Sequence, residues 1–160
     1  MSESQSGTLV SPGEGASVWL VGDLITVKVA SEDTDGAFSI LEESTPPQGG
    51  PPPHLHQQEG EALYVLEGEV EFLVGERTIR AGTGSCAYIP RRTLHTFKNV
   101  GTSLSRVLFV LTPGGLDKFF LEAGEPATEG SSPPEGQPDV ERIVEIGQKY
   151  GLEIPPPPGQ

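Results

Sequence analysis

The chain has 160 residues, the length of one ordinary domain, and it carries a formal net charge of −13. Its ten Lys and Arg residues are scattered, which argues against a phosphate-backbone partner, so we expect no nucleic acid to bind. The longest apolar runs, such as Val107–Leu111, are too short to span a bilayer, so we expect no membrane partner. The 21 Gly and 16 Pro residues favour many short strands joined by turns over a helical bundle.

The N-terminal segment, residues 1–16, is small, polar and Gly-rich, so we expect it to be flexible. Within it, Met1–Gly15 has no basic stretch followed by an apolar stretch, so no secretory signal is visible. The single cysteine, Cys86, excludes an internal disulfide, which suits a reducing compartment. We therefore expect a cytoplasmic protein.

Residues 17–124 follow as a series of short predicted strands separated by turns. Apolar and polar residues alternate in several of them, so that Val70, Phe72 and Val74, for example, share one face. Short strands at this spacing predict an all-β sandwich or barrel rather than βαβ units. In chain order they are Ile25–Ala30, Ala37–Leu41, Ala62–Glu67, Glu69–Val74, Thr78–Arg80, Ser85–Ile89, Thr93–Asn99 and Leu104–Thr112.

Two of the runs are apolar on both faces, namely Leu63–Leu66 and Val107–Leu111. A strand of a small barrel needs only one buried face, so something must cover the other face. The N-terminal strands of the same chain or a second subunit could do so. Of the two, we favour a homodimer.

Residues 125–160 differ in character from the strands before them. A short helix over Gly115–Ala123 precedes them, and Glu125–Pro138 is a Pro/Gly/Ser/Glu linker. Asp139 is expected to cap a second helix that Gly151 ends, before a proline tail. These helices are expected to pack on the outside, and the alternative is that the first one forms a lid over the barrel mouth.

All three histidines fall into one pattern. His54 and His56 are two residues apart, so on a strand their rings leave the same face. Glu61 follows at the start of the next strand, and His95 comes from a later one. Three imidazoles and one carboxylate suit a borderline divalent metal and leave coordination positions open. Spacing and residue type alone leave a metal site and ordinary surface or core histidines equally open.

Two motifs carry a resemblance to a known superfamily. The first reads His54-Leu55-His56, four residues, Glu61, six residues, Gly68. The second reads Gly84, five residues, Pro90-Arg91-Arg92, two residues, His95, three residues, Asn99. In both motifs the chain resembles the cupin superfamily. The departure is Arg92, where the family has Gly, and we expect the turn there to be built without a left-handed backbone.

The resemblance implies an all-β fold, an antiparallel cupin-type β-barrel (a jelly-roll-like double-stranded β-helix) with short C-terminal helices. It also implies that His54, His56, Glu61 and His95 bind one divalent metal ion. Mn, Fe, Co, Ni, Cu and Zn all tolerate such a ligand set, so the identity of the metal stays open. Glu59 comes too early in the motif to be a ligand and is expected to face solvent.

Several segments are similar to the monocupin relatives of quercetin dioxygenase: residues 49–54, 61–68, 112–115 with 119–120, and 150–153. This finer resemblance implies a metal-dependent dioxygenase of quercetinase type that cleaves a flavonol-like aromatic substrate with O2. Glu61 would then be both metal ligand and catalytic base. Phe97 has the same strand parity as His95, so it is expected to point into the barrel as a substrate contact or as ordinary core.

Two other functions stay open, because a fold does not determine a function. One is a non-catalytic small-molecule-binding or sensory metal cupin. The other is a sugar or small-acid isomerase or epimerase. That reaction needs further acid–base groups, of which the sequence offers few once all three histidines are ligands.

Overall fold

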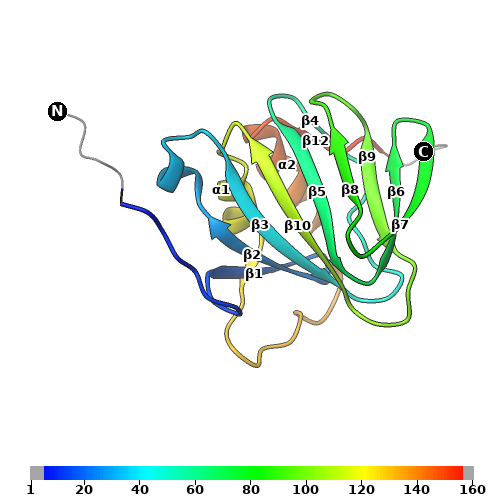
Figure 1. The fold of residues 1–160 in the computed structure, drawn as a ribbon, viewed down its shortest axis with the longest axis horizontal. Helices are drawn as coiled ribbons and strands as arrows, with labels where there is room; N and C mark the ends of the chain where they lie inside the picture. The colour runs from blue at the N-terminus through cyan, green and yellow to red at the C-terminus, as the bar shows by residue number, and fades with distance from the viewer. Residues whose placement is uncertain (1–5, 157–160) are drawn as a thin grey trace.

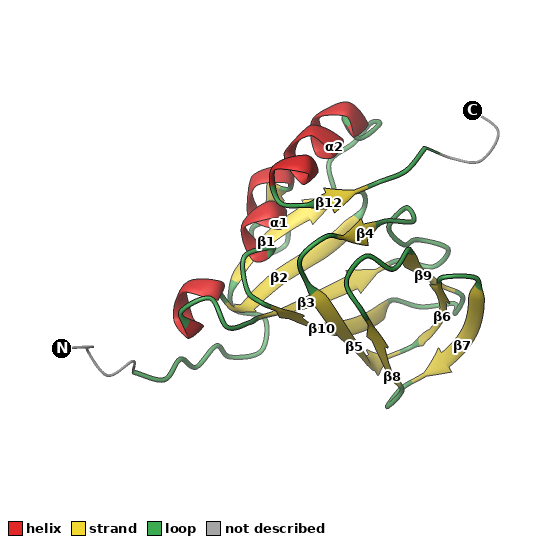
Figure 2. Cartoon of the chain, turned by 90° about the horizontal axis from the view of Figure 1, so that it is seen from above, coloured by secondary structure: helices red, strands yellow, loops and turns green. Residues whose placement is uncertain are grey.

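Two antiparallel sheets face each other, and two helices lie beside the strands β1 and β2 (Figures 1 and 2). The computed structural model describes residues 6–156. The strands are β1 (Ala16–Leu20), β2 (Asp23–Val29), β3 (Ser39–Thr45), β4 (Leu55–His56), β5 (Gly60–Glu67), β6 (Glu69–Val74), β7 (Arg77–Gly82), β8 (Cys86–Ile89), β9 (His95–Asn99), β10 (Ser105–Thr112), β11 (Glu125–Pro126) and β12 (Leu152–Glu153). The helices are α1 (Asp117–Ala123) and α2 (Val140–Lys149), and a 3-10 turn covers Ser31–Thr34.

The larger sheet has the strand order β11-β1-β2-β3-β10-β5-β8, and the smaller one has the order β7-β6-β9. β4 pairs with β12, and a single bridge between His54 and His95 joins β4 to the β9 edge of the smaller sheet. This arrangement confirms the all-β, jelly-roll-like prediction. The expected barrel is, however, not closed in the described part of the chain, because β7 and β8 are both edge strands with no ladder between them. Charged side chains such as Arg77 and Arg80 on β7 protect an edge from pairing.

The core lies between the two sheets. Alternate residues of β10, namely Val107, Phe109 and Leu111, point inward and are at most 4 % exposed. The ring of Phe97 packs edge-to-face on the rings of Phe72 and Phe109, with centroid distances of 6.3 Å in both pairs. These three aromatic residues therefore tie the small sheet to the large one, and each such side chain contributes about 1.5–3 kcal/mol by its burial.

The C-terminal segment packs against the body of the fold. Asp139 caps α2 as expected, since its Oδ1 accepts a hydrogen bond from the Arg142 backbone N–H at 3.1 Å. The Arg142 guanidinium donates to the carbonyl oxygens of Glu122 and Ala123 at the end of α1. β11, inside the segment expected to be a linker, pairs with β1. Neither helix of the described residues is long and apolar enough to cross a membrane.

Candidate metal centre

His54, His56, Glu61 and His95 meet at one point, and we call them the His₃Glu cluster. One possible ligand atom from each side chain lies within 4.8 Å of those of the others. His54 directly precedes β4, His56 is on β4, and Glu61 is on β5. His95 begins β9. The structure thus brings together all four residues that the sequence singled out.

Backbone pairing explains why the cluster forms. The His54 N–H donates to the His95 carbonyl at 3.0 Å, and the His95 N–H donates back at 2.9 Å. His56 is held from its other side, because β12 places Leu152 opposite it. The Gln57 N–H extends that pairing by donating to the Gly151 carbonyl at 2.8 Å. The C-terminal segment therefore holds β4, the strand that carries His56 and directly follows His54.

The segment that leads into the His-x-His motif is pressed against β9. The Thr96 hydroxyl donates to the Pro51 carbonyl, and the Gln48 N–H donates to the Asn99 carbonyl at 2.9 Å. Gly50 has a φ of 154°, and a Cβ there would lie 2.0 Å from the Phe97 carbonyl oxygen. Only glycine permits so close an approach, which fixes the path of the chain into His54.

The imidazole rings are oriented by hydrogen bonds at Nδ1. His54 Nδ1 lies 2.8 Å from the Pro52 carbonyl, and His95 Nδ1 lies 2.8 Å from the Thr93 carbonyl. Because a carbonyl can only accept, both Nδ1 atoms carry a proton. The Nε2 of the neutral His54 ring therefore keeps its lone pair, whereas the Nε2 of His95 donates to Glu61 and would present a lone pair to a metal ion once that proton is lost. The Nδ1–H tautomer is the one that a metal-binding histidine adopts.

The Glu61 carboxylate lies between two of the rings. Its Oε2 is 3.1 Å from His56 Nε2 and 2.9 Å from His95 Nε2, and all three residues are at most 4 % exposed. Burial raises the pKa of Glu61, but the hydrogen bonds to the two histidines outweigh it and hold this pKa well below its usual range. The carboxylate is therefore ionised at neutral pH.

The histidine rings respond differently to burial. Burial, with the nearby His95 and His56, lowers the pKa of His54 to about 3, so this ring is neutral at physiological pH. Burial also lowers the pKa of His95, but its contact with Glu61 reverses the direction, and the pKa ends above the usual value. Buried imidazole and carboxylate donors of this kind fit a divalent cation, whose charge compensates the carboxylate.

The turn before His95 departs from the sequence-based prediction. Arg92 has a φ of 64°, so the turn does use a left-handed backbone, and the expectation that it would avoid one was wrong. The Arg92 N–H donates to the His56 carbonyl at 2.7 Å. This bond connects the turn to β4 and offsets the strain of a side chain in that conformation.

Glu59 is a second correction. It was expected to face solvent, but it is only 4 % exposed, and its Oε2 has no hydrogen-bond partner in the described part of the chain. Glu59 directly precedes β5, in the turn between His56 and Glu61. Burial raises the pKa of Glu59, while nearby His56 opposes that rise.

Phe97 lies where strand parity places it, inside the fold and 3 % exposed. Its ring packs on Phe72 and Phe109, as a core residue does. A contact between Phe97 and a substrate stays a prediction. Asn99, expected to be structural, is fully buried and donates to the carbonyl oxygens of Thr45 and Ser103, while its Oδ1 accepts from Gly101.

The fold and the cluster together define a family. The two sheets, the His-x-His strand, Glu61 and the later His95 are the features that the cupin motifs specify, and residues 41–111 match the family described as "Cupin domain". Residues 41–111 therefore form a cupin domain.

Among individual proteins, the chain is similar to a quercetin 2,3-dioxygenase of Bacillus subtilis, with 25% identity over 150 residues. That match covers 93% of this chain but only 44% of the relative, so the chain spans less than half of its length.

Solved structures show the same fold. KdgF from Halomonas sp. superposes with a TM-score of 0.63 at 16% identity, over 71% of this chain and 99% of that one. The polyketide cyclase RemF from Streptomyces resistomycificus has a TM-score of 0.51 at 28% identity, over 65% of this chain and 71% of that one. Proteins with different names therefore share this scaffold, and the fold alone assigns no reaction.

Proposed function

We propose that the chain is a metal-dependent dioxygenase of quercetinase type, which cleaves a flavonol-like aromatic substrate with O2. The observation that carries the proposal is the ionised Glu61 carboxylate between the imidazoles of His56 and His95. A second support is the similarity to a quercetin 2,3-dioxygenase along 93% of the chain.

In this proposal His54, His56, Glu61 and His95 are the ligands of one divalent metal ion. When bound, the ion acts as a Lewis acid that favours the deprotonated form of a coordinated substrate hydroxyl. Glu61 accepts the proton of that hydroxyl on a carboxylate oxygen. The neutral His54 and the carbonyl-bound His95 keep their positions, because their Nδ1–H groups are held by the backbone.

The test is oxygen uptake with quercetin after separate loading with Mn, Fe, Co, Ni, Cu and Zn. We expect uptake with at least one metal, and its loss in His56→Ala and Glu61→Ala. Glu67→Ala, an exposed position on the same strand as Glu61, is the matched control and should retain the wild-type rate. A fully metal-loaded protein that consumes no oxygen with any flavonol would rule out the proposal.

The same preparation separates the two other candidate functions. A binding or sensory cupin would gain thermal stability from a small molecule that is recovered unchanged. An isomerase or epimerase would convert a sugar or small acid with no oxygen consumed. Either result, together with absent flavonol oxidation, replaces the dioxygenase assignment.

A further inference from the structure

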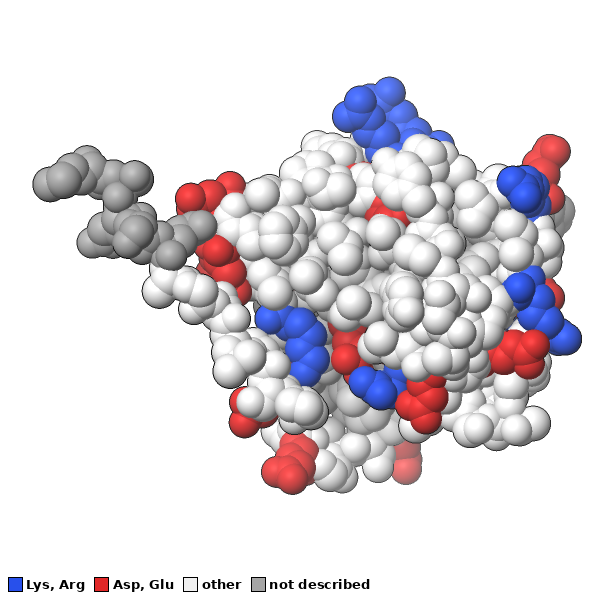
Figure 3. Space-filling view, viewed as in Figure 1, with Lys and Arg blue, Asp and Glu red and all other residues white. Residues whose placement is uncertain are grey.

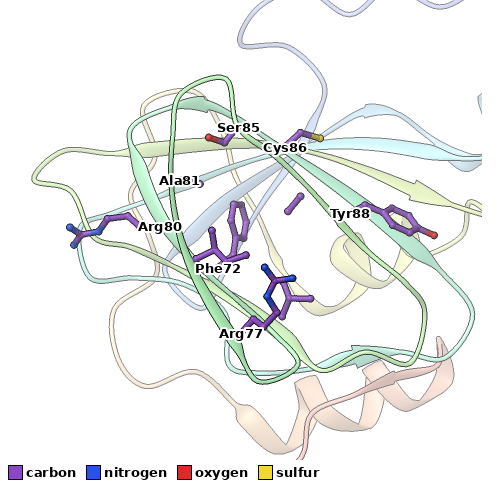
Figure 4. Close-up of a pocket in the computed structure, with 10 residues that line it drawn as sticks. Phe72, Arg77, Arg80, Ala81, Ser85, Cys86 and Tyr88 are labelled. Carbon is purple, nitrogen blue, oxygen red and sulfur yellow. The ribbon is translucent and has the colours of Figure 1, made fainter.

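A cleft opens where the two sheets fail to join. It lies between the edge strands β7 and β8, has a volume of about 290 Å³, and is lined by residues of β6, β7 and β8 (Figure 4). This volume is near the lower end of the range for small-molecule pockets, roughly 300–1,000 Å³. Because neither edge has a partner strand, backbone N–H and C=O groups also face the cleft without a ladder bond.

The inner wall of the cleft is apolar. Phe72 and Ala81 are buried at its base, and Val74 and Ala87 are half-buried beside them. Ile79, at the rim, is 44% exposed. An aromatic ring could therefore stack against Phe72 and be shielded from water on one face.

The mouth of the cleft carries one unpaired cation. Figure 4 shows the Arg77 side chain turned toward the middle of the cleft, whereas Arg80 and Tyr88 point to its outer sides. Arg80 lies 3.7 Å from Glu69, while Arg77 forms neither an ion pair nor a side-chain hydrogen bond with any residue from 6 to 156. In a chain with a net charge of −13, a free guanidinium over an apolar wall is an exception.

The cleft is also next to the His₃Glu cluster. Val74 on β6 is the register partner of His95 on β9, and Ile89, which follows Tyr88 on β8, is the register partner of Glu61. A molecule in the cleft would therefore lie one strand away from two of the four cluster residues.

We propose that this cleft binds a small anionic aromatic molecule, with its ring against Phe72 and its charged oxygen on the Arg77 guanidinium. Guanidinium groups bind carboxylates and phenolates through charge-assisted hydrogen bonds. The apolar wall disfavours sugars, which would leave polar groups unpaired there. The binding proposal stands independently of the proposed function. Only the further statement that this ligand is the enzyme's substrate, and that the substrate enters as an anion, rests on that function.

The test uses metal-free protein, so that its outcome does not depend on oxygen chemistry. Calorimetric titration compares 1-naphthoate with the neutral 1-naphthalenemethanol, and NMR shift mapping locates both. We expect naphthoate to bind more tightly and to shift the amides of β7 and β8. Arg77→Gln should weaken naphthoate about tenfold, the loss of one hydrogen bond to a charged group, and should leave the alcohol within twofold.

Two further variants complete the design. Arg80→Gln removes a charge from the same strand whose side chain points to the outer side of the cleft and lies near Glu69, so it should change neither affinity by more than twofold. Ala87→Leu narrows the cleft and should weaken both compounds. Three results would each overturn the proposal. The wild type could bind the two compounds equally tightly, it could bind neither, or Arg77→Gln and Arg80→Gln could have equal effects.

These outcomes separate the two proposals. If naphthoate binds in an Arg77-dependent way but no flavonol is oxidised, the proposal for the cleft is retained and the proposal of a dioxygenase is rejected. If the protein oxidises flavonols, Arg77→Gln leaves that rate unchanged, and naphthoate does not bind, only the proposal for the cleft is rejected.

Discussion

At the scale of single residues, Glu59 brings a second carboxylate close to the His₃Glu cluster. Its Oε2 and the Nδ1 of His56 are both buried without a hydrogen-bond partner in the described residues. Metal-binding histidines usually donate their second N–H to a carboxylate or a carbonyl, and such partners tune metal affinity. Glu59 is therefore placed to add negative charge next to a bound cation.

We predict that Glu59→Gln, which keeps the shape and removes the charge, lowers metal affinity about tenfold. The measurement is a competition titration with a chelator and Co²⁺ or Zn²⁺. Glu67→Gln, at the exposed end of β5, is the control and should leave affinity unchanged. Equal affinities of Glu59→Gln and the wild type would show that Glu59 is only a packing residue.

Arg92 stores strain at a turn, because its φ of 64° is unfavourable for a residue with a Cβ. We predict that Arg92→Gly increases the free energy of unfolding by about 0.5–1 kcal/mol, the relief of strain less the entropy of an added glycine. The neighbouring Arg91→Gly should instead decrease it, since the φ of Arg91 is not positive. Urea unfolding measures both, and a loss of stability in both variants would contradict the explanation.

At the scale of elements, β2 and β3 are joined by a buried acidic pair. The Thr45 hydroxyl donates to Asp23 Oδ2 at 3.0 Å, and Glu43 lies beside Asp23, with both carboxyl groups at most 4 % exposed. Burial raises the pKa of Glu43, and the contact with Asp23 and the charge of Glu61 raise it further. Burial also raises the pKa of Asp23. Such a pair is stable only if it retains a proton.

This pair predicts a pH dependence of folding. Because the folded state holds the Glu43 proton more tightly than the unfolded chain, stability is highest below the unfolded pKa, about 4.3, as far as this group is concerned. It then falls as the pH rises from there toward the folded pKa of Glu43. We expect Glu43→Gln to flatten this fall in urea unfolding at a series of pH values. Glu76→Gln, exposed in a turn, should keep the wild-type slope.

At the scale of the whole molecule, the outer face of the large sheet is largely uncharged, with acidic and basic groups mostly toward its margins (Figure 3). On β5 and β8, Tyr64 is 44% exposed and Tyr88 is 66% exposed. Leu108, opposite Tyr64 in the register, continues the face on β10. Two chains of charge −13 repel each other, and this repulsion is weakest when they meet through a neutral surface such as this one.

We therefore predict a homodimer through this face, the association that the doubly apolar strands suggested. Sedimentation velocity at increasing concentration should show the dimer, and Leu108→Glu should shift it to monomer. Leu121→Glu, at an exposed apolar position on α1, is the control and should stay dimeric. A wild-type chain that remains monomeric at about 100 μM, far above the Kd of a stable dimer, would refute this prediction.

Much of the fold could be predicted because it follows from local pattern. Strand parity placed Phe72 and Phe97 inside, and the limits of β6 were predicted to the residue. The Asp139 cap needed only its own neighbours in the chain. By contrast, β11 and β12 were not predicted as strands, because the pairing of two-residue strands depends on partners far away in the sequence.

The candidate site divides in the same way. The sequence identified the four side chains of the His₃Glu cluster through the resemblance of its two motifs to the cupin superfamily, because motif residues and their spacing are properties of the sequence alone. Only the tertiary structure decided that Glu59 is buried, that Arg92 takes a left-handed backbone, and that a cleft with Arg77 at its mouth lies between β7 and β8. Each of these depends on which distant segments come together, and one strand pattern is compatible with several such arrangements.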